Sequence, residues 1–343
     1  MTATITKFAA QERGGQRPVR LLICDDSVFM RMALVALCED HPEIEIVGEA
    51  ENGLEAVEAA RRLQPDVITM DIAMPHQDGI SATREILSEA DTSIIVLSSL
   101  SEQRHTLANE LLNLGAVDVI WKSASMLDID LDGIAATMLE KIIFWGRNSF
   151  GSEQDEIGDS PKIEILVKRK EPKLLLLKAG AGSVPILKDI VETFSTGCLP
   201  VLISANVPRS CIESLETFLK RKSIRPLMPV EDGLGLETGV TYIMNEQSRF
   251  GVIGERGSCR FRPLALLDAK DNLITTLVKS GYLPVTIALP GVSDEYLLHP
   301  ENVFSGGQFC FLGEEGRSPQ TAPSKEWISI NSRIHLNRVL EIL

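Results

Sequence analysis

Residues 19–26 read Val-Arg-Leu-Leu-Ile-Cys-Asp-Asp, an apolar run that ends in two adjacent carboxylates. A second run, Asp66-Val-Ile-Thr-Met70, is followed by Asp71. If these runs are neighbouring parallel strands, Asp25, Asp26 and Asp71 leave the sheet at the carboxyl edge, where open α/β sheets bind their ligands. Crowded carboxylates repel one another unless a hard cation such as Mg²⁺ lies among them. The two runs therefore predict a metal-assisted phosphate site in which one aspartate accepts a phosphoryl group.

The sequence around these runs alternates between strand and helix patterns. Leu54, Val57 and Arg61, for example, recur at helical spacing. Five such repeats predict one doubly wound α/β domain with a parallel sheet over residues 19–147. The expected strands are 19–24, 44–48, 66–70, 93–98 and 117–121, and the expected helices are 27–40, 52–63, 79–90, 102–114 and 128–146.

A change of composition separates this domain from a second α/β pattern. Residues 148–172 are rich in Gly, Ser and charged residues, which predicts a linker, and Ile163–Val167 within it has the composition of a short strand. The second domain is expected over residues 173–343. Its expected strands are 173–178, 199–204, 240–244, 250–254 and 284–289, and its expected helices lie near 184–195, 209–221, 268–280 and 330–343.

Composition limits the classes of protein that fit this chain. Its 343 residues, 44% of them hydrophobic, suit two domains, and no apolar run is long enough to span a bilayer. Residues 1–18 are polar and are interpreted as a disordered lead-in without a secretory signal. Six widely spaced cysteines predict reduced thiols and a cytoplasmic location. The net charge of −14 opposes binding to nucleic acid or membranes, so protein partners are expected.

Four segments carry a specific similarity: Ile23-Cys-Asp-Asp-Ser-Val-Phe-Met-Arg31, Thr69-Met-Asp-Ile-Ala-Met-Pro-His-Gln-Asp-Gly79, Ile95-Val-Leu-Ser-Ser-Leu100 and Trp121-Lys122. In these segments the first domain resembles the receiver domain of response regulators. The resemblance implies a (βα)5 fold with Asp71 as the phosphoacceptor. It also implies that Asp25, Asp26, Asp71 and the backbone carbonyl of Ala73 surround a Mg²⁺ ion.

The same resemblance assigns two further residues. Ser98 would hydrogen-bond the phosphoryl group, and Lys122 would pair with it. These residue types suit phosphoryl transfer, which depends on charge neutralisation and alignment. The alternative is that Asp25 and Asp26 only cap the helix that follows them. Because several functional residue types fall at the ends of the expected strands, the phosphoryl site is the favoured interpretation.

Two positions depart from the receiver pattern. Ser123 follows Lys122 where the family usually has a proline, and Val119 stands where an aromatic residue commonly rotates on activation. The first departure affects the loop after the fifth strand, and the second removes half of the usual switch. Phosphorylation is therefore better supported than the usual output motion.

The order of a receiver, a linker and an α/β domain resembles the chemotaxis methylesterase response regulators. Five segments of the second domain follow that family's order: Lys173–Ser183, Val201–Pro208, Val230–Gly233 with Gly239–Ile243, Arg262-Pro263 and Val285–Gly291. The resemblance implies a Rossmann-type domain that, in the family, hydrolyses glutamyl methyl esters on chemoreceptors with a Ser-His-Asp triad.

The catalytic positions of that family do not carry over. Gly180 falls where the nucleophilic serine belongs, and Asn206 falls where the histidine belongs. Asp294 and Glu295 lie near the position of the aspartate, without its glycine-rich surroundings. A triad without its nucleophile and base retains at most binding and oxyanion effects, and asparagine is not a general base at neutral pH. The sequence therefore predicts a catalytically degenerate second domain.

A displaced active site is the alternative, with Ser183 as its nucleophile. Such a site needs a nearby base, but the second domain has only His299 and His335, both in loop-like or terminal context. A helix-capping role for Ser183 is the simpler interpretation. Gly180, Gly182 and Ser183 also form a short Gly-x-Gly turn that suits an anion, although this motif alone is weak evidence.

Two function hypotheses follow. In the first, a histidine kinase or a small phosphodonor phosphorylates Asp71, and the second domain acts as a pseudoenzyme that binds chemoreceptors or other signalling proteins. In the second, the chain is an active protein-glutamate methylesterase with displaced catalytic residues. A transcription factor is disfavoured because the chain is acidic and has no basic recognition helix.

Overall fold

The structure is a computed structural model. It describes residues 17–98, 110–122, 131–148, 173–180, 182–193, 199–268 and 271–289, together with the backbone of 308–312 and 327–330. Three expected features lie outside these ranges: the lead-in up to residue 16, the strand at 163–167 and the C-terminal helix beyond residue 330.

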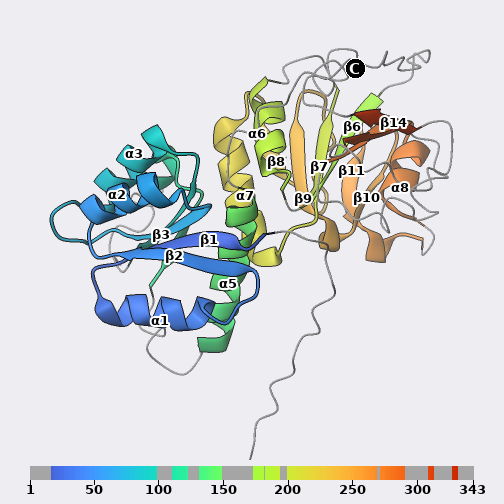
Figure 1. The fold of residues 1–343 in the computed structure, drawn as a ribbon. Coiled ribbons are helices and arrows are strands. Elements are labelled where there is room, and N and C mark those ends of the chain that lie inside the picture. The colour runs from blue at the N-terminus through green and yellow to red at the C-terminus, as the bar shows by residue number, and fades with distance from the viewer. Residues whose placement is uncertain are drawn as a thin grey trace, which may run out of the picture.

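The first domain contains a sheet of five parallel strands in the order β2-β1-β3-β4-β5. The strands are β1 (Val19–Cys24), β2 (Ile44–Ala50), β3 (Val67–Asp71), β4 (Ser93–Ser98) and β5 (Asp118–Trp121). The helices are α1 (Val28–Cys38), α2 (Gly53–Leu63), α3 (Gly79–Glu89) and α5 (Leu131–Arg147), and residues 110–114 are also helical. Helices α1 and α5 cover one face of the sheet, and α2 and α3 cover the other (Figure 1). The predicted doubly wound fold is confirmed.

Polar residues directly after the strands begin the helices. The Ser27 hydroxyl accepts a hydrogen bond from the Met30 amide at 3.4 Å, and the Asp78 carboxylate accepts one from the Ser81 amide at 2.7 Å. These caps satisfy amide groups that have no partner within the helix. The strand-to-helix turns of the first domain are therefore fixed locally, and they carry the residues of the site described below.

The second domain contains seven parallel strands in the order β14-β13-β12-β6-β7-β9-β8. Its elements are β6 (Lys173–Ala179), α6 (Val184–Thr193), β7 (Val201–Ala205), α7 (Arg209–Lys222), β8 (Leu227–Pro229), β9 (Thr241–Asn245), β10 (Phe250–Ile253), β11 (Arg260–Pro263), α8 (Leu273–Lys279), β12 (Leu283–Ala288), β13 (Gln308–Leu312) and β14 (Trp327–Ile330). Helices α6 and α7 pack on one face, and β10, β11 and α8 pack on the other.

The predicted strand assignments of this domain need two corrections. The strand expected at 250–254 is β10, which pairs only with β11 in an antiparallel ribbon and not with the parallel sheet. The expected set of strands is also incomplete, because β8 and β11 are not in it and because β13 and β14 extend the sheet after Pro290. Strands of four or five residues carry a weak periodic signal, and these two are stabilised by pairing, β13 with β12 and β14 with β13.

The two domains meet through helices α5 and α7 (Figure 1). The Trp145 ring of α5 packs edge-on against the Phe218 ring of α7, with 5.6 Å between the ring centroids. Buried apolar residues on both sides of this contact form one continuous cluster. Within the described ranges, no helix has the length and apolar character needed to cross a membrane.

Candidate functional site

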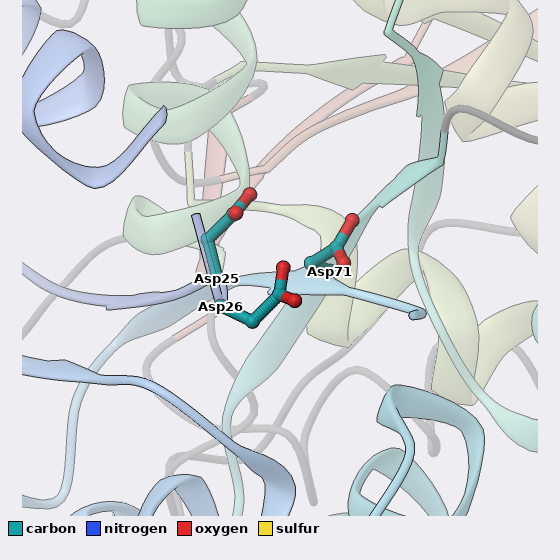
Figure 2. Close-up of side chains that lie close together, drawn as sticks. All are labelled: Asp25, Asp26 and Asp71. Atoms are coloured by element: carbon teal, nitrogen blue, oxygen red, sulfur yellow. The ribbon is translucent and has the colours of Figure 1, made fainter. Parts of the chain in front are cut away.

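Three carboxylates converge at the carboxyl edge of the first sheet. Strands β1 and β3 pair in parallel with Cys24 opposite Met70, so the residues that follow them leave the sheet side by side. Asp25, Asp26 and Asp71 each offer a carboxylate oxygen, and these three atoms lie within 4.8 Å of one another. Figure 2 shows the three side chains around a common space.

One lysine side chain is shared between two of these carboxylates. The Lys122 ammonium, which follows β5, donates to Asp25 Oδ2 at 2.6 Å and forms an ion pair with Asp71 Oδ1. Asp25 and Asp71 are buried, whereas Asp26 is exposed. Within the described residues, the Asp26 carboxylate has no hydrogen bond or ion pair. Among the described residues, Lys122 is thus the one cation that contacts any of these three carboxylates.

This imbalance changes the acidity of the buried groups. Burial raises the pKa of the Asp71 carboxyl above its usual value; the charges of Asp25 and Asp26 add to this rise, and Lys122 opposes it. Burial by itself lowers the pKa of Lys122, but hydrogen bonds to Asp25 and Asp71 outweigh burial and hold that pKa above its usual value. The lysine therefore stays charged while the site retains an excess of negative charge.

The donor set suits a hard divalent cation such as Mg²⁺. Its oxygens come from three carboxylates, which are the ligands that this ion prefers in proteins. The backbone of Ala73 also reaches the site, because its amide donates to Asp71 Oδ2 at 3.0 Å. The Ala73 carbonyl remains a predicted ligand of Mg²⁺.

Ser98 ends β4, the strand next to β3, and its side chain is buried. The Lys122 amide donates to the Ser98 carbonyl at 2.7 Å, which places the two residues at neighbouring strand ends. Of the two departures from the receiver pattern, Val119 is partly buried against the core and Ser123 lies outside the described residues.

Gly79 holds the turn after β3 close to Asp71. A Cβ atom at this position would lie 1.9 Å from the Asp71 carbonyl oxygen, so any side chain would displace the backbone. The Gly79 amide also donates to the Ile72 carbonyl at 2.9 Å. The close packing at Gly79 therefore supports the position of Asp71.

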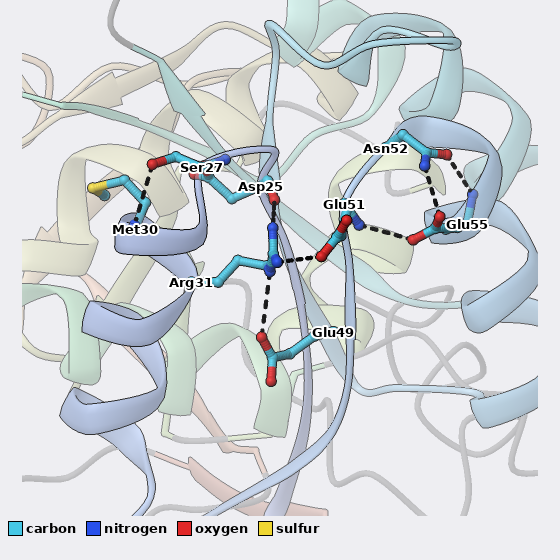
Figure 3. A network of polar contacts seen from close by, with 8 residues as sticks. All are labelled: Asp25, Ser27, Met30, Arg31, Glu49, Glu51, Asn52 and Glu55. Carbon is cyan, nitrogen blue, oxygen red and sulfur yellow. Dashed lines mark hydrogen bonds and ion pairs between the residues drawn. The ribbon is translucent and has the colours of Figure 1, made fainter.

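Sequence reasoning missed Arg31 as part of this site. Its guanidinium is buried and donates to the Asp25 carbonyl at 2.8 Å, as Figure 3 shows. The available signal was a basic residue in an otherwise uncharged, largely apolar helix, α1. Such a residue must find a polar partner when it is buried.

The second sheet has a different carboxyl edge. Ala179 of β6 pairs with Ala205 of β7, so the next residues, Gly180 and Asn206, lie at adjacent strand ends. Neither side chain is a nucleophile or a base. Ser183 is fully buried, and its hydroxyl donates to the Gly180 carbonyl at 2.5 Å and accepts from the Gly180 amide at 2.7 Å.

The amide groups expected to bind an anion already have a partner. Asn148, which follows α5, places its Oδ1 atom 2.9 Å from the Gly182 amide and 3.1 Å from the Val184 amide. Asn148 itself is fully buried and donates to the Phe144 carbonyl at 2.6 Å. The residue after the last helix of the first domain therefore caps helix α6 of the second.

A buried ion pair that the sequence did not indicate lies nearby. The Lys178 ammonium donates to Ser204 Oγ at 3.0 Å and to Glu246 Oε1 at 2.9 Å. Burial lowers the pKa of Lys178, and Glu246 opposes this shift without cancelling it. Ser204 is only 1% exposed, so its hydroxyl is closed to solvent. This arrangement is typical of a structural pair. The predicted degenerate positions Asp294 and Glu295 lie outside the described residues, as do both histidines.

Comparison with known proteins gives consistent matches. The family described as response regulator receiver domain matches residues 21–131. A protein-glutamate methylesterase/protein-glutamine glutaminase of Thermotoga maritima is 32% identical over 261 residues, which cover 75% of this chain and 74% of that protein. A second such protein, from Carboxydothermus hydrogenoformans, is 33% identical over 64% of this chain and 65% of its own length. Among solved structures, the response regulator domain of Thermotoga maritima CheB is 45% identical, with a TM-score of 0.35, and covers 37% of this chain and 94% of that chain.

Proposed function

Because the chain belongs to the family of chemotaxis methylesterase-type response regulators, we propose that it is phosphorylated at Asp71 in a two-component, chemotaxis-like pathway. Its second domain then acts through protein interaction and not through hydrolysis. The observation that carries the proposal is the group of three carboxylate oxygens within 4.8 Å of one another. Two of the three residues, Asp25 and Asp71, also form ion pairs with Lys122.

The buried carboxylate of Asp71 is the nucleophile. One of its oxygens forms a bond to phosphorus while the phosphorus–nitrogen bond of a phosphohistidine, or the phosphorus–oxygen bond of acetyl phosphate, breaks. The leaving group departs with the electron pair. Lys122 pairs with the phosphoryl oxygens and neutralises them, and the Ser98 hydroxyl donates a hydrogen bond to one of them. Asp25, Asp26, Asp71 and the Ala73 carbonyl would hold Mg²⁺, which would supply further charge neutralisation.

Strand β5 connects this chemistry to the second domain. Lys122 follows its last residue, and Asp118 is its first. The Asp118 Oδ2 atom accepts from Ser214 of α7 at 2.7 Å and pairs with Lys141 of α5 at 2.8 Å. A shift of Lys122 towards a phosphoryl group therefore pulls on the strand that holds the domain junction.

An apolar patch beside the site suits a protein phosphodonor. Val28, Phe29 and Met32 lie on the first turns of α1, which begins two residues after Asp26, and they are 59%, 62% and 66% exposed. A histidine kinase that delivers its phosphoryl group to Asp71 must approach this edge. Exposed apolar patches next to functional groups commonly bind proteins. Phe29→Ser is expected to slow transfer from the kinase while leaving transfer from acetyl phosphate unchanged.

The proposal is tested by labelling with acetyl phosphate. The wild-type chain is expected to incorporate phosphate only when Mg²⁺ is present, and Asp71→Asn is expected to abolish incorporation. Asp78→Asn is the matched control, because it alters a helix-capping carboxylate after the same strand. Labelling of the Asp71→Asn protein at the wild-type rate would refute the assignment of the phosphoacceptor. Affinity capture with and without beryllofluoride then identifies the partners that depend on the phosphorylated state.

A second candidate function comes from the names of the relatives. If the chain is an active protein-glutamate methylesterase, purified protein demethylates receptors well above the solvent background, and Ser183→Ala removes that activity. We expect neither result. Gly180 and Asn206 supply no nucleophile or base, and the Ser183 hydroxyl is already bonded within its own loop.

A further inference from the structure

Asp25 is held at four points. Its amide donates to the Ala50 carbonyl at 3.1 Å, and its Oδ1 atom accepts from the Ser27 amide at 2.9 Å. Its Oδ2 atom accepts from Lys122, as described above. The remaining group, the Asp25 carbonyl, accepts from Arg31 at 2.8 Å. The first three contacts fix the Asp25 side chain and its backbone amide, and the fourth fixes its backbone carbonyl.

The Arg31 guanidinium is fixed in turn. Its NH2 group lies 2.5 Å from Glu51 Oε1, and its Nε atom lies 3.4 Å from Glu49 Oε2. The residue is 7% exposed, and Figure 3 shows its donors directed at three different oxygens. A planar guanidinium with partners on several sides has little freedom to turn. Arg31 is therefore a rigid donor to the Asp25 carbonyl.

The position of that carbonyl controls Asp26. It belongs to the planar peptide unit that links Asp25 to Asp26, so holding its oxygen also sets the direction of the Asp26 Cα atom. The Asp26 carboxylate itself has no hydrogen bond or ion pair within the described part of the chain. Its direction towards Asp71 is thus set through the backbone.

We infer that Arg31 is a positioning residue for the divalent cation: by holding the Asp25–Asp26 peptide, it directs the Asp26 carboxylate into the group of three acids. This inference rests on the proposed function only in that the same acids bind Mg²⁺. It concerns how the metal ligands are oriented, and it adds no role in the transfer step.

Charge and geometry predict effects of opposite sign, which makes the inference testable. Arg31 is a cation near a cation site, so if only its charge mattered, removing it would strengthen Mg²⁺ binding. If it directs Asp26, removing it weakens Mg²⁺ binding. Arg31→Gln removes both the charge and the donor geometry, whereas Arg31→Lys keeps the charge and loses the planar donor set.

The experiment measures the Kd of the full chain for Mg²⁺ by calorimetry, without a phosphodonor. Arg31→Gln is expected to weaken binding by about tenfold, as the loss of outer-shell partners commonly does. Arg31→Lys, which keeps the repulsive charge and loses the planar donor set, is expected to weaken it at least as much. Arg61→Gln is the matched control, because Arg61 also pairs with two glutamates, Glu85 and Glu89, but does not contact the acidic group. Its Kd is expected to stay at the wild-type value.

Two outcomes separate this inference from the proposed function. The role of Arg31 is overturned if a folded Arg31→Gln protein binds Mg²⁺ as tightly as the wild type or more tightly. If the glutamine variant does not fold, binding of Mg²⁺ by Arg31→Lys with the wild-type Kd overturns it. Absence of Mg²⁺ binding by the wild type refutes the metal site itself. Urea unfolding without Mg²⁺ identifies which variants are folded.

Discussion

At the carboxyl edge of the first sheet, Lys122 pairs with two of three clustered carboxylates, whereas at the same edge of the second sheet Lys178 pairs with the carboxylate of Glu246. The first group has an exposed member, Asp26, without an ion pair among the described residues. The second is closed, and its Ser204 is buried. Excess charge is costly to the fold and suits a site that must bind a cation and an anion in turn. A balanced pair contributes to the fold and leaves little capacity for a ligand.

The largest expected effect comes from Asp71→Asn, which removes one of the excess negative charges at the first edge. Phosphate labelling falls to background, while the free energy of unfolding at pH 7 rises. Because the pKa of Asp71 is higher in the folded chain than in the unfolded chain, wild-type stability is lost as the pH rises through the folded pKa. The advantage of the variant is therefore larger at pH 7 than at pH 4.

Urea unfolding at both pH values, without Mg²⁺, measures this difference. A variant that is less stable than the wild type at pH 7 would mean that Asp71 stabilises the fold, and the contrast between the two edges would fail.

The balanced pair of the second sheet is expected to respond asymmetrically. Glu246→Ala removes a carboxylate that pairs with the buried Lys178 and costs about 3 kcal/mol, whereas Lys178→Met costs less than about 1 kcal/mol because Glu246 is 20% exposed. In the folded Glu246→Ala protein, burial favours the neutral form of Lys178. The loss of unfolding free energy in this variant therefore becomes smaller as the pH rises from 7 towards 10. Chemical unfolding across this range provides the test. Similar losses in both variants would show that the pair does not behave as a buried structural one.

Backbone packing beneath the first edge is tested by Gly79→Ala. The added Cβ collides with the Asp71 carbonyl oxygen, and such overpacking costs about 1–3 kcal/mol. Labelling should also slow, because the phosphoacceptor moves. Gly235→Ala is the control, since an added Cβ there meets no atom closer than 3.7 Å. Wild-type stability of the Gly79→Ala protein would show that close packing at Gly79 does not support the position of Asp71.

The smallest effect is expected at the turn that precedes α6. Asn148→Ala removes a buried helix cap and costs about 1–2 kcal/mol. Asn206→Ala, at an exposed position of the adjacent strand end, is expected to change stability by less than about 0.5 kcal/mol. Thermal unfolding of the two variants compares them directly. A larger loss for Asn206→Ala would mean that this position has a structural role that its exposure does not suggest.

The sequence alone determined the doubly wound class, the strand ends of the first domain and the convergence of Asp25, Asp26 and Asp71, because periodicity and the parallel sheet rule fix where side chains leave the strands. The family resemblance also aligned Gly180 and Asn206 with the family's catalytic positions, and the structure brings them to adjacent strand ends. The sequence did not identify the separate ribbon of β10 and β11, because the pattern of a single strand does not indicate which other strand it pairs with.

Only the tertiary structure decided which distant groups meet. Lys178, Ser204 and Glu246 come from three regions of the second domain, and Asn148 reaches Gly182 across the junction of the two domains. Arg31 contacts the carbonyl of Asp25, a backbone atom whose direction leaves no mark in the sequence. Such contacts depend on strand order, register and the orientation of the domains, and these follow from packing the whole chain and not from any local pattern.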